Sequence, residues 1–130
     1  MVNIVIDASF LLAYLLPDEK YPEADKAILS HIAEEVHCIA PSLLKFEVAN
    51  ALYAAVLRKR ISPPLAQKLI KHMLDLCIEE YPIQFLDALK VSFKHHLSVY
   101  DASYLVLARK YHIALLTMDK GLKKVSQEKL

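Results

Sequence analysis

The sequence predicts an α/β fold in three layers (α/β/α), with a central parallel sheet between two layers of helices. Short, continuously apolar segments alternate with longer segments of helical periodicity, and prolines mark several of the boundaries. Strands that are apolar throughout are typical of a parallel sheet covered on both faces. The 130 residues are enough for one domain with a substantial core, so we expect a single domain over residues 1–130.

In the first half of the chain, prolines help to place the elements. Pro17 ends the helix expected after the first strand, and Pro22 suits the first turn of the next helix. In order, we expect a strand at residues 2–6, helices at about 9–16 and 22–33, a strand at 36–40 and a long helix from 41–42 to about 59.

The second half starts with Ser62 before two prolines, a pattern that predicts a helix N-terminus. The final ten residues indicate no particular element. In order, we expect a helix at about residues 62–76, a short strand within 77–83, helices at about 86–96 and 100–111, and a strand at 113–117.

Four acidic residues occupy positions where apolar side chains would be expected. Asp7 ends the first strand, and Glu47 lies inside a largely apolar helix. Asp101 heads an apolar helical stripe, and Asp119 follows the last strand. Burying a carboxylate costs several kcal/mol unless it is compensated. No Lys or Arg stands beside Asp7 or Asp101 in sequence, so a divalent cation is the simplest compensation if the fold brings the four together.

Ligands of parallel α/β sheets bind outside the carboxyl ends of the strands. Asp7 and Asp119 follow two such ends, and Glu47 and Asp101 lie in early turns of helices. All four can therefore line one rim of the sheet. Glu47 and a second polar residue, Asn50, are three apart and share a helical face.

Two hydroxyl residues accompany the acids. Ser9 follows Asp7 by two residues, and Thr117 precedes Asp119 by two. Such groups can orient a carboxylate or hold a metal-bound water. Taken alone, each is better explained as a helix cap or a strand threonine.

Simpler explanations of the acids remain open at this point. Asp7 and Asp119 are suited to N-cap the helical turns that follow them. Asp101 stands three residues after Ser98, which is the spacing of a capping box. Glu47 has no comparable explanation, because we expect it well inside its helix.

Composition excludes several classes of function. Gly121 is the only glycine, so Gly-rich phosphate loops and bound nucleotide cofactors of that type are excluded. The net charge of +1 provides no general basic field, so any RNA contact must come from local basic residues. The candidates are Arg58, Lys59, Arg60 and Lys120.

The expected location is the cytoplasm, with no membrane contact. The N-terminal apolar run is interrupted at Asp7, and the longest apolar helical stretch is too short to cross a bilayer. Cys38 and Cys77 match no metal or CxxC pattern, so we expect both to be reduced and buried.

Four segments together resemble the PIN-domain ribonucleases, and are most similar to the VapC-type toxins of toxin–antitoxin pairs. They have the order and spacing of that family, and the resemblance spans nearly the whole chain. The segments are residues 5–9, 41–52, 98–108 and 115–119.

The resemblance implies a divalent-metal-dependent endoribonuclease with Mg²⁺ or Mn²⁺ in an acidic pocket. It also implies an RNA substrate, a homodimer and a small antitoxin partner that blocks the pocket. By this resemblance Asp7, Glu47, Asp101 and Asp119 are the catalytic and metal-binding acids, and Ser9, Asn50 and Thr117 line the pocket.

Three other interpretations fit less well. A receiver domain needs an acidic pair after the first strand, where only Asp7 stands, and an Asp after a middle strand. A haloacid-dehalogenase phosphatase needs DxD, but position 9 is Ser9. A catalytically silent PIN-like module that binds RNA or protein is disfavoured by the intact acids and stays open as the main alternative.

Overall fold

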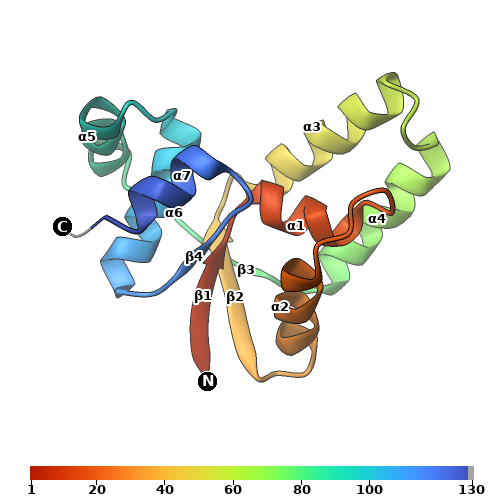
Figure 1. Cartoon of the computed structure of the whole chain (residues 1–130), viewed down its shortest axis with the longest axis horizontal. Helices are drawn as coiled ribbons and strands as arrows, with labels where there is room; N and C mark the ends of the chain where they lie inside the picture. The colour runs from red at the N-terminus through yellow and green to blue at the C-terminus, as the bar shows by residue number, and fades with distance from the viewer. Residues whose placement is uncertain (129–130) are drawn as a thin grey trace.

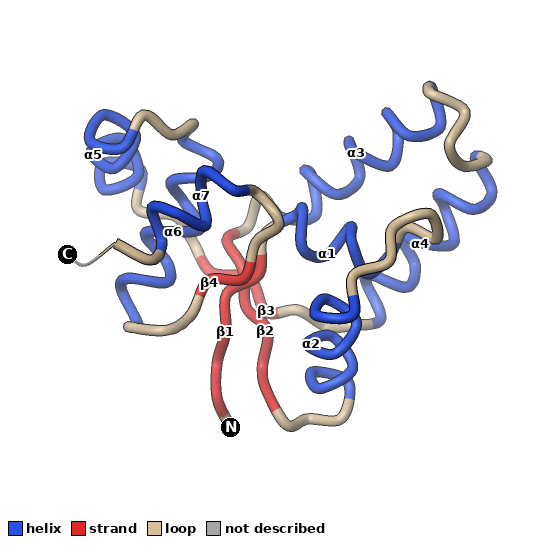
Figure 2. Tube along the Cα trace, in the orientation of Figure 1, coloured by secondary structure: helices blue, strands red, loops and turns tan. Residues whose placement is uncertain are grey.

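The computed structural model describes residues 1–128, which form a four-stranded parallel sheet flanked by seven helices (Figures 1 and 2). The strand order is β3-β2-β1-β4. The strands are β1 Val2–Ile6, β2 Val36–Pro41, β3 Glu79–Tyr81 and β4 Leu115–Leu116. The helices are α1 Ala8–Leu15, α2 Pro22–Ile32, α3 Leu44–Leu57, α4 Pro63–Asp75, α5 Phe85–His95, α6 Val99–Tyr111 and α7 Lys120–Ser126.

The helices form a layer on each face of the sheet. Helices α1 to α4 lie on one side, where α2 contacts β2 and α1 contacts both α2 and α3 (Figure 1). On the other side, α6 packs against β1 and β2 and is covered by α5 and α7. Both faces of the sheet are therefore buried, as the apolar strands predict. In the described part of the chain, no helix has the length and apolar character needed to cross a membrane.

The core is built around the central strand β1. Val5 pairs with Ile39 of β2 on one side and with Leu115 of β4 on the other. Val5 and Ile6 are fully buried, as are Leu11 of α1 and other apolar side chains of both layers. This packing fixes the direction in which the residues after β1 leave the sheet.

The predicted α/β/α fold is confirmed, and the differences lie at the edges of the sheet. Strand β4 is only two residues long, although five were expected. Strand β3 is polar rather than apolar because it is an edge strand: Glu79 bonds to His37 at 2.6 Å, and Glu80 pairs with Lys45 at 2.9 Å. The ambiguous C-terminal residues include helix α7.

One prediction about the cysteines is wrong. Cys38 is a free, buried thiol in β2, as expected, but Cys77 is free and exposed. The reason is that Cys77 lies in the turn after α4, where its backbone is left-handed with φ of 53°. Its side chain is therefore turned away from the neighbouring core residues Leu76 and Ile78, which are buried.

Several helices end in a left-handed residue other than glycine. His96 after α5 and His112 after α6 have φ values of 56° and 53°. Glycine is the usual residue at such helix ends because its missing Cβ removes the steric cost. Since the only glycine is Gly121, these helix ends carry a conformational cost that a substitution can remove.

The substitution His112→Gly is therefore expected to raise the free energy of unfolding by about 0.5–1 kcal/mol, because glycine adopts the left-handed conformation without strain. Urea denaturation followed by circular dichroism measures the change. The matched control is Lys110→Gly, inside α6, which should lower stability by about 0.5–1 kcal/mol. A loss of stability in both variants would contradict the proposed cost at His112.

Candidate active site

The candidate site lies at the carboxyl end of the sheet, between β1 and β4. From β1 the chain continues to β2 and β3 on one side of β1, and it then crosses the sheet to β4 on the other side of β1. The strand order therefore changes direction between β1 and β4. Crevices at such switch points are the usual ligand sites of open α/β sheets. Asp7 follows β1 at this point, and Asp119 follows β4.

Asp7 is the most buried of the four acids, with 4% of its surface exposed. Its Oδ1 accepts hydrogen bonds from the Ser9 hydroxyl at 2.7 Å and the Phe10 backbone N–H at 2.9 Å. Its Oδ2 accepts a bond from the Thr117 hydroxyl. Three donors thus hold the carboxylate in one orientation, which offsets part of the cost of its burial.

The two hydroxyl residues also tie the end of β1 to the segment after β4. The Ser9 Oγ accepts a bond from the Met118 N–H at 2.9 Å, and the Thr117 Oγ1 accepts one from the Asp119 N–H at 3.0 Å. The Asp7 N–H donates to the Leu116 carbonyl at 3.2 Å. The structure thus places Ser9 and Thr117 beside Asp7, as the sequence predicts.

Glu47 reaches the site from α3 and is held by a residue that the sequence analysis missed. The Tyr104 hydroxyl of α6 donates to the Glu47 Oε1 at 2.5 Å. Tyr104 is 1% exposed, and Glu47 is half-buried. A buried tyrosine hydroxyl usually needs a hydrogen-bond partner. The position of Tyr104 in an apolar helical segment is therefore the signal that could have identified this residue. The partner, 57 residues away, could not be read from the sequence.

Asp101 and Asp119 complete the group from the other helical layer. The Asp101 N–H donates to the Ser98 Oγ at 3.1 Å, so Ser98 caps α6 and Asp101 lies in its first turn. The Asp119 Oδ1 accepts a bond from the Leu122 N–H at 2.8 Å and caps α7. Asp119 therefore caps a helix and belongs to the acidic group at the same time, and Asp101 belongs to that group while lying in a capped first turn.

Mutual repulsion accompanies this arrangement. Burial raises the pKa of Asp7, although its three hydrogen bonds act in the opposite direction, and the charge of Asp119 raises the pKa further. Burial also raises the pKa of Asp101, with contributions from Asp119 and Asp7. The pKa of Glu47 is raised by burial and by Asp101 and Asp7, against the bond from Tyr104. Each acid thus interacts electrostatically with others of the group.

Two expectations about the acids need correction. Asp7 alone is buried, whereas Asp101 is half-buried and Asp119 is exposed, because the last two lie on the rim where helices begin. Glu47 lies in the first turn of α3 rather than well inside it, because the helix starts at Leu44 and not at Ser42. The four acids therefore lie along a rim that is open to solvent at Asp119 and partly open at Asp101 and Glu47.

The remaining predicted residues lie outside the hydrogen-bonded group. Asn50 is exposed on α3, and no hydrogen bond joins it to Glu47 within residues 1–128. The basic residues Arg58 and Lys59 follow the end of α3 that is distant from the sheet (Figure 1). Arg60 pairs with Asp18 at 2.9 Å, while Lys120 is exposed beside Asp119 at the start of α7.

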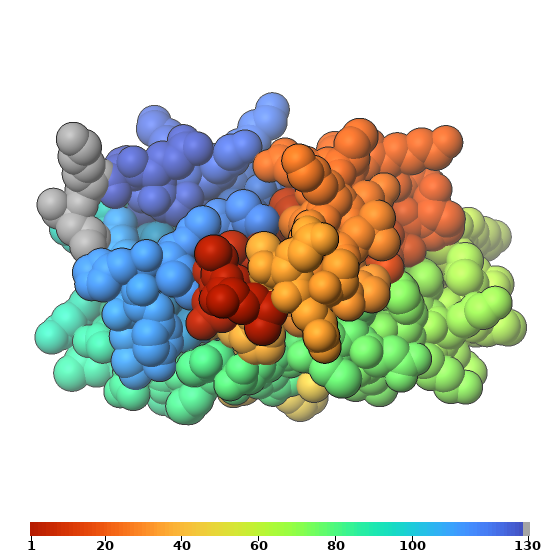
Figure 3. Space-filling model, turned by 90° about the horizontal axis from the view of Figure 1, so that it is seen from below, coloured from red at the N-terminus to blue at the C-terminus, as the bar shows by residue number. Residues whose placement is uncertain are grey.

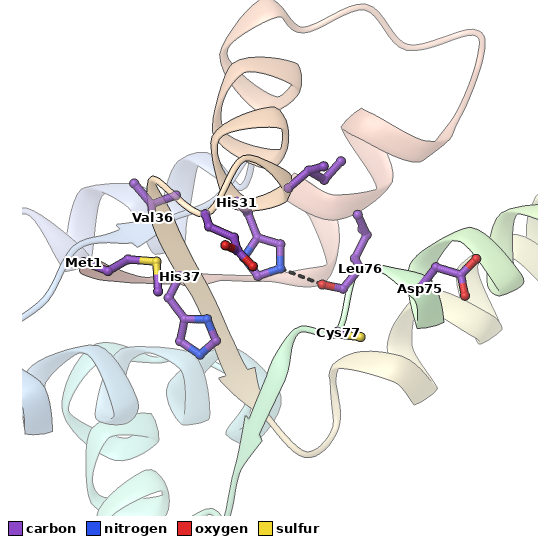
Figure 4. Close-up of a pocket in the computed structure, with 9 residues that line it drawn as sticks. Met1, His31, Val36, His37, Asp75, Leu76 and Cys77 are labelled. Carbon is purple, nitrogen blue, oxygen red and sulfur yellow. Dashed lines mark hydrogen bonds between the residues drawn. The ribbon is translucent and has the colours of Figure 1, made fainter.

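A cavity of about 380 Å³ lies at the opposite end of the sheet (Figure 4). It is lined by residues near the amino ends of the strands, a face that Figure 3 views from below. His31 there is bonded through both ring nitrogens, to the Leu76 carbonyl at 2.6 Å and the Cys38 N–H at 3.0 Å. These bonds indicate a structural histidine, so we place the site at the acids and not in this cavity.

Comparison with known proteins identifies the family. The PIN domain family matches residues 4–128. The chain belongs to the PIN domain family. Ribonuclease VapC3 of Pyrobaculum aerophilum is 32% identical to this PIN domain over 125 residues, covering 93% of this chain and 92% of the relative. Ribonuclease VapC9 of Mycobacterium tuberculosis is 33% identical over 124 residues, covering 95% and 91%. The predicted resemblance to VapC proteins is confirmed.

Solved structures agree with this assignment. The crystal structure of PAE2754 from Pyrobaculum aerophilum superposes on the PIN domain with a TM-score of 0.74 at 25% identity, covering 93% of this chain and 77% of that chain. VapC20 of Mycobacterium tuberculosis, a sarcin–ricin loop cleaving toxin, has a TM-score of 0.64 at 14% identity and covers 94% of each chain. The second likeness supports the fold alone.

The repulsion predicts how the metal-free protein responds to pH. Folding raises the pKa of Asp101 above its ordinary value of 3.8, so the folded state binds protons more tightly than the unfolded state. The free energy of unfolding contributed by this group therefore falls as pH rises from about 4 through the raised pKa. Asp101→Asn should remove that contribution, leaving stability in EDTA at neutral pH unchanged or higher.

Urea denaturation in EDTA across about pH 4 to 7 measures this effect. The matched control is Asp87→Asn, because Asp87 also lies in the first turn of a helix but is exposed on α5, outside the acidic group. The control should retain the wild-type fall in stability with pH. A large loss of stability in Asp101→Asn alone would indicate that Asp101 serves mainly to start α6.

Proposed function

We propose that this PIN domain is a divalent-metal-dependent endoribonuclease that hydrolyses RNA phosphodiester bonds. The observation that carries the proposal is the grouping of Asp7, Glu47, Asp101 and Asp119 at the switch point of the sheet, with raised pKa values for the first three. Acids with pKa values perturbed by burial and by like charges are typical of functional sites. The ribonuclease relatives named above support RNA as the substrate.

The donor set fits Mg²⁺ or Mn²⁺, because every candidate ligand is a carboxylate or hydroxyl oxygen. Within residues 1–128, no three His, Cys, Asp or Glu side chains converge closely enough to hold an ion by themselves. Mg²⁺ usually keeps several waters and binds through one or two carboxylates, so a hydrated ion suits this open rim. When bound, such an ion would activate a water and neutralise charge on the leaving oxygen.

Each acid then has a role that follows from its surroundings. Asp7 and Asp101 are the proposed principal ligands: Asp7 is held by three donors, and Asp101, in the first turn of α6, is close enough for the charge of Asp7 to raise its pKa. Glu47 and Asp119 are further ligands or bases that position the attacking water. Ser9 and Thr117 keep the Asp7 carboxylate in place, and we retain Asn50 as a candidate pocket residue.

RNA binding is proposed for local basic residues. Lys120 is exposed immediately beside Asp119, where an ammonium group could contact a phosphate next to the acids. Arg58 and Lys59 are exposed at the far end of α3 and could contact a more distant part of the strand. Arg60 is the weakest candidate, because its charge is paired with Asp18.

Cleavage of RNA by the purified protein tests the proposal. Wild-type protein should cut transfer or ribosomal RNA with Mg²⁺ or Mn²⁺ and not in EDTA. Asp101→Asn should lower the rate more than about 100-fold, because metal chemistry contributes several kcal/mol to the barrier. Asp87→Asn should cut at the wild-type rate. Equal, metal-independent results for wild type and Asp101→Asn would favour a catalytically silent module that binds RNA or protein.

A small antitoxin protein is the proposed partner, acting in the cytoplasm. The grouped carboxylates would attract a basic side chain, and such a contact would block the metal site. A largely apolar groove of about 600 Å³ between α3 and α4 would bind an apolar segment of the same partner. Its lining includes Ala49, Leu52 and Ile70.

We also propose that the protein forms a homodimer through α5, with a second copy as the occupant of its exposed apolar face. Phe85 and Phe93 are each 73% exposed, and they follow one face of the helix together with Leu89. Such a patch on a monomer is typical of an interface. No charged residue stands on that three-residue stripe, which suits contact with the same stripe of another copy.

Light scattering after size exclusion tests the dimer. Wild-type protein should have the mass of two chains, and Phe93→Asp should have the mass of one, because a charge in the apolar interface is not compensated. Leu29→Asp is the matched control, since Leu29 is 57% exposed on α2 in the other helical layer. A monomeric wild type, or a dimeric Phe93→Asp, would contradict the proposed interface.

A further inference from the structure

We propose that Tyr104 is a positioning residue that fixes the Glu47 carboxylate for metal binding. The inference rests on the proposed function and assigns a role to a residue that does not itself contact the ion. Its basis is the 2.5 Å hydrogen bond from the Tyr104 hydroxyl to the Glu47 Oε1. That bond joins α6 to α3, which belong to opposite helical layers.

The phenol group is well suited to hold another side chain still. The Tyr104 ring is 1% exposed and lies on α6 among the buried residues Ala102, Leu105 and Ala108. A ring packed in this way has little rotamer freedom, so its hydroxyl oxygen occupies a defined place at the edge of the core. The position of that oxygen is therefore set by the fold and not by the acids.

Glu47, in contrast, has reasons to move. Its side chain is half-buried at the start of α3, and it is repelled by the charges of Asp101 and Asp7. A glutamate that is partly exposed to water can relieve such repulsion by rotating outward, at the cost of leaving the site. The bond from Tyr104 opposes this rotation and restricts the conformational freedom of the side chain.

The geometry of the bond leaves the carboxylate able to bind a metal. Tyr104 uses Oε1, and within residues 1–128 no hydrogen bond involves Oε2 of Glu47. One oxygen is thus anchored while the other is available to an ion or its water. Partners that orient metal ligands in this way contribute to metal affinity without contacting the metal.

The test is Tyr104→Phe in the full chain, which removes only the hydroxyl. Calorimetric titration with Mn²⁺ should show binding about 10-fold to 100-fold weaker than in wild type. RNA cleavage at saturating Mn²⁺ gives an independent second reading and should also be slower. Circular dichroism should show an unchanged fold. Wild-type Mn²⁺ affinity in Tyr104→Phe would overturn the proposal.

Tyr14→Phe is the matched control, because the Tyr14 hydroxyl also bonds to a side chain, His72, at 2.7 Å but lies outside the acidic group. It should leave Mn²⁺ affinity and cleavage at the wild-type level. An equal loss in Tyr14→Phe would indicate a general effect on the fold and would overturn the proposal.

A double-mutant cycle with Glu47→Ala separates positioning from packing. If Tyr104 acts through Glu47, adding Tyr104→Phe to Glu47→Ala should weaken Mn²⁺ binding by less than 2-fold, well under the 10-fold to 100-fold loss expected in wild type. Full additivity would overturn the proposal. A wild-type protein that neither binds Mn²⁺ nor cuts RNA would instead refute the proposed function itself, and the positioning role with it.

Discussion

Repulsion among carboxylates at one end of the sheet is the constraint to which the rest of the structure responds. Asp7, Glu47, Asp101 and Asp119 interact electrostatically, and burial adds to the cost of their charge. Each of them also stands at the start of a helix: Asp7 and Asp119 cap α1 and α7, while Glu47 and Asp101 lie in the first turns of α3 and α6. Helix N-termini carry partial positive charge and free N–H groups, so they stabilise acids at these positions.

This arrangement connects the topology of the sheet to the chemistry of the site. In a parallel sheet the chain leaves every strand at the same end, and the following helices begin there. Four helix N-termini can therefore be gathered around one crevice by connections of ordinary length. The apolar layers keep the sheet buried, and the hydroxyls of Ser9 and Thr117 join β1 to the segment after β4. The acids are held together by the scaffold rather than by attraction for one another.

The elements that could be predicted from sequence are those whose local chemistry is strong. Apolar runs and proline positions were sufficient to predict the buried strands β1 and β2 and the long helices. The short edge strands were harder, because Glu79 and Glu80 are stabilised by His37 and Lys45 from β2 and α3. Helix α7, with seven residues, is too short to show a clear period. Such elements are decided by neighbours that are distant in sequence.

The sequence by itself determined the fold class and selected the four acids as candidates for the site, because an uncompensated carboxylate beside an apolar run is visible as a local anomaly. The alternative role of these acids at helix N-termini was equally visible. In the structure Asp7 and Asp119 both cap a helix and belong to the acidic group. Only the tertiary structure decided how exposed each acid is and which residue holds Glu47. The reason is that burial and hydrogen-bond partners depend on chain segments brought together by packing, such as Tyr104 and Glu47, 57 residues apart.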